Sequence, residues 1–140
     1  MFWGNSQLYW SKLRDNMIEL EGDIHTIDLP RFTEAPWLHK REDTYYLSYA
    51  YGWPEKTAYA TSSHIEGPYT YGGIISEQSY NCNTNHQAII EFKGQSYFFY
   101  HNGELGGSYR RSVCIDSLHY GPGGAIQPVQ LTDTGVDTVQ

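Results

Sequence analysis

The feature of this sequence that most constrains its fold is a repeat of about 51 residues. A shift of about 51 positions pairs Tyr46 with Tyr97 and Leu47 with Phe98, within runs that share one pattern. These runs are short, aromatic and bounded by turn residues, as expected for β-strands, and no helical periodicity interrupts them. Short strands repeated every 40 to 50 residues or so are typical of the four-stranded blades of a β-propeller. We therefore predict an all-β fold, a partial propeller of about two and a half four-stranded blades.

The repeat places residues 1–140 in one partial domain. Residues 1–30 are expected to end one blade, 31–80 to form a second and 81–140 a third. The shift lays the third strand of the second blade, 56–62, over 107–113, and Gly-Pro turns at 67–68 and 121–122 are expected to lead into fourth strands. An incomplete propeller leaves an unpaired strand edge, which favours pairing with another chain. We therefore expect either further blades upstream or self-association through the open blade edges.

Composition points to a neutral partner such as a carbohydrate. Aromatic residues make up 16% of the chain, with 13 Tyr and 4 Trp, whereas Lys and Arg together number only 9. The net charge of −7 argues against nucleic acid and anionic membrane surfaces as partners, because both attract basic proteins. No apolar stretch approaches the roughly 18 to 20 residues needed to cross a bilayer.

Two residues begin successive inner strands, which line the channel of a propeller. Glu34 opens one blade among apolar neighbours, and His86 falls close to the equivalent place one repeat later. A carboxylic acid among apolar groups can serve as a general acid, although a Glu before a strand is commonly a solvated surface residue. His86 could hold a metal ion or a water on the channel axis, or be a hydrogen-bonded histidine that binds no metal.

Five further side chains complete the candidates. Arg110 and Arg111 are neighbours in a strand, so only one of them can face a given side and reach a sugar. Trp53 lies in a loop and could stack on a sugar ring. The two cysteines, Cys82 and Cys114, are expected to be unpaired, partly buried thiols, with a disulfide between them as the alternative.

Several separated motifs resemble glycoside hydrolase family 43, and its xylosidases and arabinofuranosidases in particular. They occupy residues 34–40, 84–89, 97–102 and 108–116, so the resemblance extends over nearly the whole chain. It implies a five-bladed β-propeller and an inverting glycosidase with three acidic residues: a base, an acid and an Asp that tunes the acid. The implied substrate is an arabinose- or xylose-containing plant polysaccharide such as arabinoxylan. The family also implies a secreted or periplasmic location.

The resemblance assigns roles to individual residues. Glu34 matches the catalytic acid, and Ala35 stands where the family usually has Gly. His86 matches the channel histidine that in many members contacts an axial calcium ion or its water, which implies one calcium on the propeller axis. Arg111 matches the substrate-binding arginine better than Arg110 does. Asn85, within the matching motif, and Trp53 are expected to bind substrate beside it.

One departure from the family pattern concerns the catalytic base. Both catalytic aspartates of the family precede the acid and are typically followed by Pro, but this chain has no Asp-Pro pair. Asp15, Asp23 and Asp28 precede Glu34 and fall in expected turns or connections rather than at a channel mouth. We therefore expect a glycosidase truncated before its base, inactive on its own. The alternative is a non-catalytic carbohydrate-binding propeller module built on the same aromatic residues.

Overall fold

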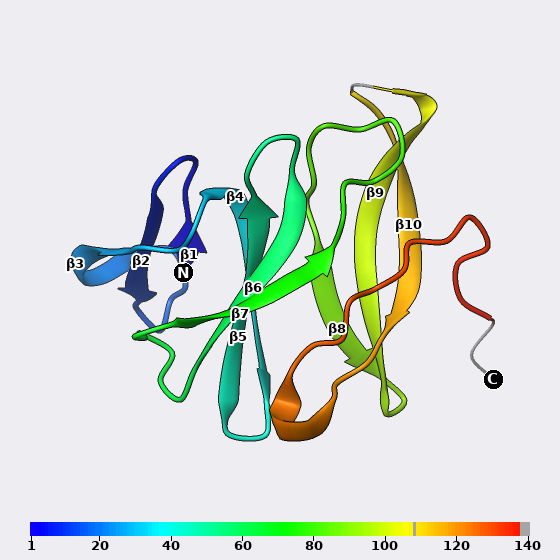
Figure 1. The fold of residues 1–140 in the computed structure, drawn as a ribbon. Helices are drawn as coiled ribbons and strands as arrows, with labels where there is room; N and C mark the ends of the chain where they lie inside the picture. Colours follow the sequence, from blue (N-terminus) through cyan, green and yellow to red (C-terminus); the bar gives the residue numbers. More distant parts are fainter. Residues whose placement is uncertain (108, 138–140) are drawn as a thin grey trace.

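The computed structural model describes residues 1–107 and 109–137, which form ten strands in three antiparallel sheets (Figure 1). The sheets follow one another in chain order, side by side, as propeller blades do. The first contains β1 (Phe2–Trp3), β2 (Leu8–Leu13) and β3 (Leu20–Ile27). The second contains β4 (Phe32–Arg41), β5 (Thr44–Tyr51), β6 (Lys56–Ser62) and β7 (Thr70–Ser76). The third contains β8 (Ala88–Phe92), β9 (Gln95–Gly107) and β10 (Arg110–Leu118).

These sheets confirm the all-β prediction and a partial propeller. Only the second sheet has four strands within the described residues, and the other two have three each. The described part of the chain contains one short 3-10 turn, Pro122–Gly124, and no helix long and apolar enough to cross a membrane.

Strand pairing confirms the repeat in the first two strands of the second and third sheets. Leu38 on β4 pairs with Leu47 on β5, and Ile89 on β8 pairs with Phe98 on β9. Both members of the second pair lie 51 positions after those of the first, so the two hairpins have the same register. Because side chains alternate between the faces of a strand, the same register places equivalent residues in the core.

The repeat does not extend unchanged to the third strand. Ala58 on β6 pairs with Tyr49, whereas the equivalent Tyr100 on β9 pairs with Cys114. The prediction that residues 107–113 match 56–62 is therefore wrong by five positions. The cause is the longer hairpin between β9 and β10, in which β9 continues to Gly107.

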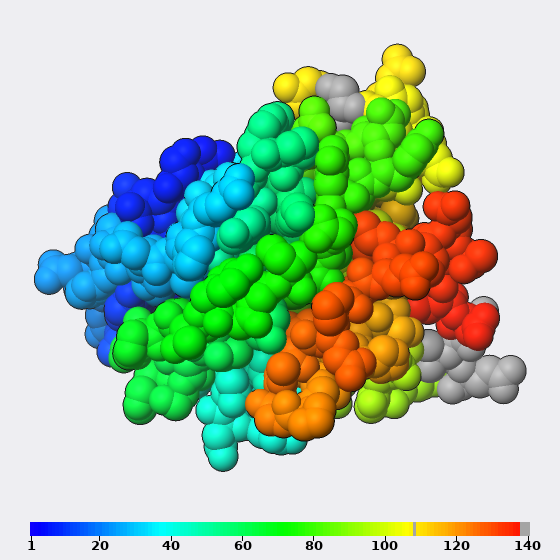
Figure 2. All heavy atoms as spheres, in the orientation of Figure 1, coloured from blue at the N-terminus to red at the C-terminus, as the bar shows by residue number. Residues whose placement is uncertain are grey.

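The segment after β10 also differs from the prediction of a fourth strand. Within residues 119–137 the only regular features are the 3-10 turn and an isolated bridge between Tyr120 and Ile126. The segment runs back over the second sheet, where the Val129 N–H donates to the Ile75 carbonyl at 2.7 Å. Figure 2 shows this segment, in orange and red, lying against β7, in green. It therefore occupies the space between the second and third sheets.

The core lies between these two sheets and under this segment. Tyr46, Tyr59, Phe98 and Leu118 are among its buried side chains, and Ile126 enters it from the C-terminal segment. Burying such large apolar and aromatic groups supplies the main stabilisation of a fold of this kind. Among the buried tyrosines, Tyr46 satisfies its hydroxyl by donating to the Gly124 carbonyl at 2.7 Å.

Candidate functional site

Glu34 lies near the start of β4, at an irregularity in its pairing with β5. The register shifts on both sides of the pair that Glu34 makes with Ala50. Ala35 has a positive φ of 57°, in the left-handed region where residues other than glycine are uncommon. Such β-bulges re-aim side chains and are frequent next to active sites. The bulge gives Glu34 an orientation that a regular strand would not.

Both oxygens of the Glu34 carboxylate have polar neighbours. Asn5 Nδ2 donates to Oε2 at 2.9 Å, and His86 Nε2 lies 3.2 Å from Oε1. The side chain of Glu34 is 25% exposed and that of His86 is 55% exposed. The apolar enclosure that we expected around Glu34 is therefore replaced by a hydrogen-bonded and partly open one. The structure brings Glu34 and His86 together, as their places in the repeat predict.

His86 belongs to a segment whose side chains alternate between exposed and buried positions. Asn85, Gln87 and Ile89 are buried, whereas His86 is exposed. Gln87 Nε2 donates to the Ala35 carbonyl at 2.9 Å, next to the bulge. The buried members of this segment therefore hold it against β4, and His86 faces outward beside Glu34.

Asn85 does not lie where a substrate ligand would be exposed. Its side chain is only 1% exposed, and Nδ2 donates to the Thr57 hydroxyl. Its backbone N–H donates to Glu55 Oε2 at 2.6 Å. The prediction that Asn85 presents itself to substrate is thus corrected in this structure: the alternation that exposes His86 turns its neighbour inward.

Glu55 is a residue of the site that the sequence reasoning missed. It follows Trp53 and Pro54 in the loop between β5 and β6, yet it is only 3% exposed. Burial raises the pKa of the Glu55 carboxyl, opposed first by the hydrogen bond from the Asn85 backbone. A buried carboxyl is uncommon unless it is paired or hydrogen-bonded, and only this burial, invisible in the sequence, distinguishes it from a surface Glu.

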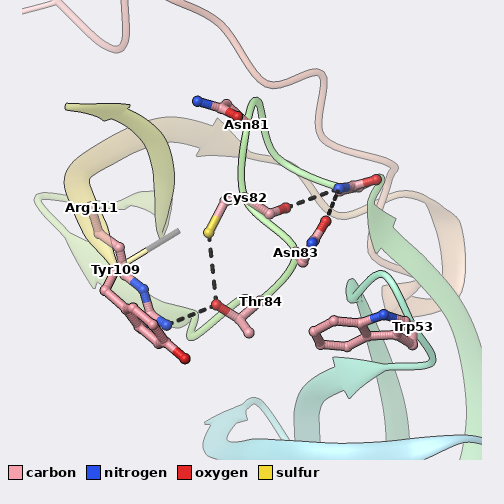
Figure 3. Close-up of a pocket in the computed structure, with 8 residues that line it drawn as sticks. Trp53, Asn81, Cys82, Asn83, Thr84, Tyr109 and Arg111 are labelled. Carbon is pink, nitrogen blue, oxygen red and sulfur yellow. Dashed lines mark hydrogen bonds between the residues drawn. The ribbon is translucent and has the colours of Figure 1, made fainter. Parts of the chain in front are cut away.

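A cavity of about 490 Å³ lies beside residues 81–84. Trp53 forms one side, Tyr109 and Arg111 form the other, and Thr84 lies between them (Figure 3). Arg111 Nη2 donates to the Thr84 hydroxyl at 2.9 Å. Arg110 does not line the cavity, so Arg111 is the arginine that faces it. The structure thus brings the predicted Trp53 and Arg111 to one cavity, while their contact with substrate stays a prediction.

A short stretch of chain connects the cavity to Glu34. Thr84 contributes to the cavity wall, and His86, two residues later, contacts Glu34. The cavity itself is lined by neither Glu34 nor His86. Thr84 to His86 thus connect the cavity wall to the residue that contacts Glu34.

The cysteines are thiols, as expected. Cys82 is buried, Cys114 is half-buried, and no disulfide joins them. Cys82 Sγ lies 3.5 Å from Nδ1 of His101, another buried side chain. Burial lowers the pKa of His101 to about 4. This imidazole is therefore neutral near pH 7.

Calcium is implied by the family resemblance, and the donors present do not make a calcium site by themselves. Among the described residues there is no group of three or more His, Cys, Asp or Glu side chains placed to hold a metal ion. His86 and Glu34 supply one imidazole and one carboxylate, whereas calcium takes six to eight oxygen ligands or so.

Comparison with protein families and curated proteins gives a consistent result. The family model of glycosyl hydrolases family 43 matches residues 1–126. A xylosidase/arabinosidase of Bacteroides ovatus is 38% identical over 105 residues, which are 74% of this chain and 32% of that protein. A beta-xylosidase of Xylanibacter ruminicola is 36% identical over 105 residues, 74% of this chain and 33% of that protein. The chain thus spans about a third of the length of these relatives.

Solved structures show the same likeness in three dimensions. A family 43 beta-xylosidase/alpha-arabinofuranosidase from a compost metagenome, in complex with xylotriose and calcium-free, has a TM-score of 0.83 and 31% identity. The match covers 89% of this chain and 43% of that one. An arabinoxylan arabinofuranohydrolase from Bacillus subtilis has a TM-score of 0.83 and 29% identity, with 96% of this chain and 31% of that one covered.

Proposed function

Because this chain belongs to glycosyl hydrolases family 43, we propose that it forms part of a glycosidase for xylose- or arabinose-containing polysaccharides, with Glu34 as proton donor. The observation that carries the proposal is the placement of the Glu34 carboxylate. A β-bulge presents it, His86 and Asn5 contact its two oxygens, and Thr84, two residues before His86, lines the cavity of Trp53 and Arg111.

Glu34 donates its proton to the oxygen of the glycosidic bond that breaks. Asn5 holds Oε2, which leaves Oε1 as the oxygen that carries the transferable proton. His86 Nε2 lies 3.2 Å from Oε1, and in the tautomer that carries the hydrogen on Nε2 it donates to the carboxylate that remains after transfer. Proton donation to the leaving group contributes about 10² to 10⁴ in rate to reactions of this kind.

In this proposal the sugar binds in the cavity. Trp53 is 63% exposed, so its indole face is available to stack on a sugar ring. The Arg111 guanidinium has several N–H donors, of which one is engaged with Thr84. Its other donors can bind sugar hydroxyls. In this assignment both side chains orient the sugar beside Glu34.

The carboxylate that activates the attacking water is assigned to a part of the protein outside these residues. Inverting glycosidases hold their two carboxyl groups roughly 6.5 to 9.5 Å apart, to leave room for that water. Glu55, the buried carboxyl near Glu34, is engaged with the Asn85 backbone and is enclosed, so it is unsuited to the task. The whole enzyme would place the base on another blade, across the channel from Glu34.

Sugar release and sugar binding test the proposal together. A polypeptide that carries this chain within a complete propeller is incubated with xylo-oligosaccharides and arabinoxylan oligosaccharides, and released sugar is measured. We expect release by the unmodified protein, none by Glu34→Gln, and binding of the oligosaccharide by both in calorimetry. Binding without release by either protein would instead identify a non-catalytic carbohydrate-binding module.

A further inference from the structure

The loop that carries Trp53 and the segment that carries His86 are joined through a single buried residue. The Glu55 N–H donates to the Asn83 carbonyl at 2.9 Å, and Glu55 Oε2 accepts from the Asn85 N–H at 2.6 Å. The two bonds contact residues on either side of Thr84. Glu55 therefore fixes the backbone at both neighbours of a residue in the cavity wall.

Side chains on both sides of this junction belong to the proposed site. Thr84, held between the two bonds, accepts from Arg111, and His86 follows Asn85 directly and contacts Glu34. Trp53 lies two residues before Glu55, on the opposite side of the cavity. The backbone N–H and the carboxylate of Glu55 thus link the loop of the stacking side chain to the two polar parts of the site.

We propose that Glu55 is a positioning residue, whose carboxylate holds the Asn85 backbone so that Thr84 faces the cavity and His86 faces Glu34. This role rests on the proposed function of the site. Glu55 is 3% exposed and does not line the cavity, so it acts through the backbone of Asn85 rather than on substrate. Burying a carboxyl group costs free energy, which the hydrogen bond from the Asn85 N–H offsets in part.

The hydrogen bond can be removed with little change in volume. Glu55→Met keeps the length of the side chain and supplies no strong acceptor, whereas Glu55→Gln keeps an acceptor oxygen for the Asn85 N–H. Glu91→Gln is the control, since Glu91 is exposed on β8. All variants are made in the polypeptide that carries this chain within a complete propeller.

Amide exchange reports the positioning itself. We expect the Asn85 amide to exchange about tenfold faster in Glu55→Met, because a buried N–H loses its acceptor. Glu55→Gln and Glu91→Gln are expected to protect it as the unmodified protein does. Unchanged protection in Glu55→Met would overturn the proposal, whatever the activity of the protein.

Kinetics then separate positioning from a structural role. Glu55→Met is expected to lower kcat per folded molecule about tenfold to hundredfold on an unactivated xyloside or arabinofuranoside, since small displacements of catalytic groups have effects of this size. Glu55→Gln should restore most of the activity. A lower melting temperature with unchanged kcat per folded molecule would mean that Glu55 only stabilises the fold, and would reject the positioning role. If Glu34→Gln also left activity unchanged, the proposed function would fail separately, while the exchange result would stand.

Discussion

The carboxylate of Glu34 and the imidazole of His86 lie 3.2 Å apart although 52 residues separate them in the chain. The same spacing of 52 positions in the chain recurs further along, where Trp37 Nε1 on β4 donates to the Ile89 carbonyl on β8 at 3.0 Å. β4 and β8 therefore run side by side in one direction with a constant offset. Because they are the first strands of successive blades, this offset brings residues from two repeats into one site.

Arg111 is expected to contribute to sugar binding more than to the chemical step. Arg111→Ala should raise KM about tenfold to hundredfold with a smaller effect on kcat, because hydrogen bonds from a charged donor are lost in both the ground state and the transition state. Initial rates over a range of oligosaccharide concentrations give both constants. Arg110→Ala is the matched control and should stay within about twofold. Equal effects of the two substitutions would contradict the orientation that the structure gives to Arg111.

Trp53 is expected to supply a stacking surface. Trp53→Ala should weaken oligosaccharide binding about tenfold, through loss of aromatic contact area. Since the side chain is 63% exposed, the melting temperature should change little. Calorimetric titration and thermal unfolding check the two expectations. Phe92→Ala, at an exposed phenylalanine on β8 that does not line the cavity, should affect neither, and a loss of binding there would point to another site.

Ala35 is expected to be a strained position. Its φ of 57° costs an alanine about 1 to 2 kcal/mol relative to the ordinary region, whereas glycine adopts it freely. After the larger entropy of glycine in the unfolded chain is subtracted, Ala35→Gly should stabilise the fold by about 0.5 to 1 kcal/mol. Urea unfolding measures this change. Ala50→Gly, at the buried partner of Glu34 on β5, should destabilise instead, and a loss of stability in Ala35→Gly would show that the bulge relaxes in solution.

His39 is expected to make stability depend on pH. Burial lowers its pKa from 6.5 to about 4, and its ring stacks on Tyr46 and contacts the Tyr120 hydroxyl at 2.8 Å. Because the folded-state pKa is the lower one, the unfolded chain takes up the proton first as pH falls. The contribution of neutral His39 to the unfolding free energy is therefore complete above about pH 6.5 and is lost as pH falls from 6.5 to about 4. The loss is about 2 kcal/mol near pH 5.

Comparison with His39→Gln isolates this effect from the other titrating groups. The unfolding free energy of the unmodified protein should fall more steeply between pH 7 and 4.5 than that of the variant. Parallel curves would mean that His39 is solvated or already protonated in the folded protein.

The strand pairs that depend on local pattern could be predicted from the sequence. Alternating aromatic and apolar residues fix which face is buried, so the equivalence of Leu47 and Phe98 follows from the repeat alone. The third strand could not be placed, because the extension of β9 to Gly107 changes the length of the hairpin without changing the pattern. The C-terminal segment has no periodicity, and its path is set by contacts such as that of Val129 with Ile75.

The sequence indicates those residues of the site whose side-chain type and motif themselves suggest a chemical role. The motifs indicate Glu34, His86 and Arg111, and the structure places Glu34 beside His86 and Arg111 beside Thr84. Glu55 was missed, because the roles of a buried and a surface Glu differ only in tertiary contacts. Asn5 was missed for the same reason, since its hydrogen bond to Glu34 spans 29 residues.

Dependence on the leaving group tests the role of Glu34 most directly. A series of aryl xylosides or arabinofuranosides with leaving groups of increasing pKa is hydrolysed by the complete propeller and by its Glu34→Gln variant. General-acid help grows with the basicity of the leaving group, so the rate of the variant should fall steeply along the series, by about 10² to 10⁴ relative to the unmodified enzyme at the basic end. It should fall far less for activated leaving groups. An equal loss across the whole series would contradict the assignment of Glu34 as the proton donor.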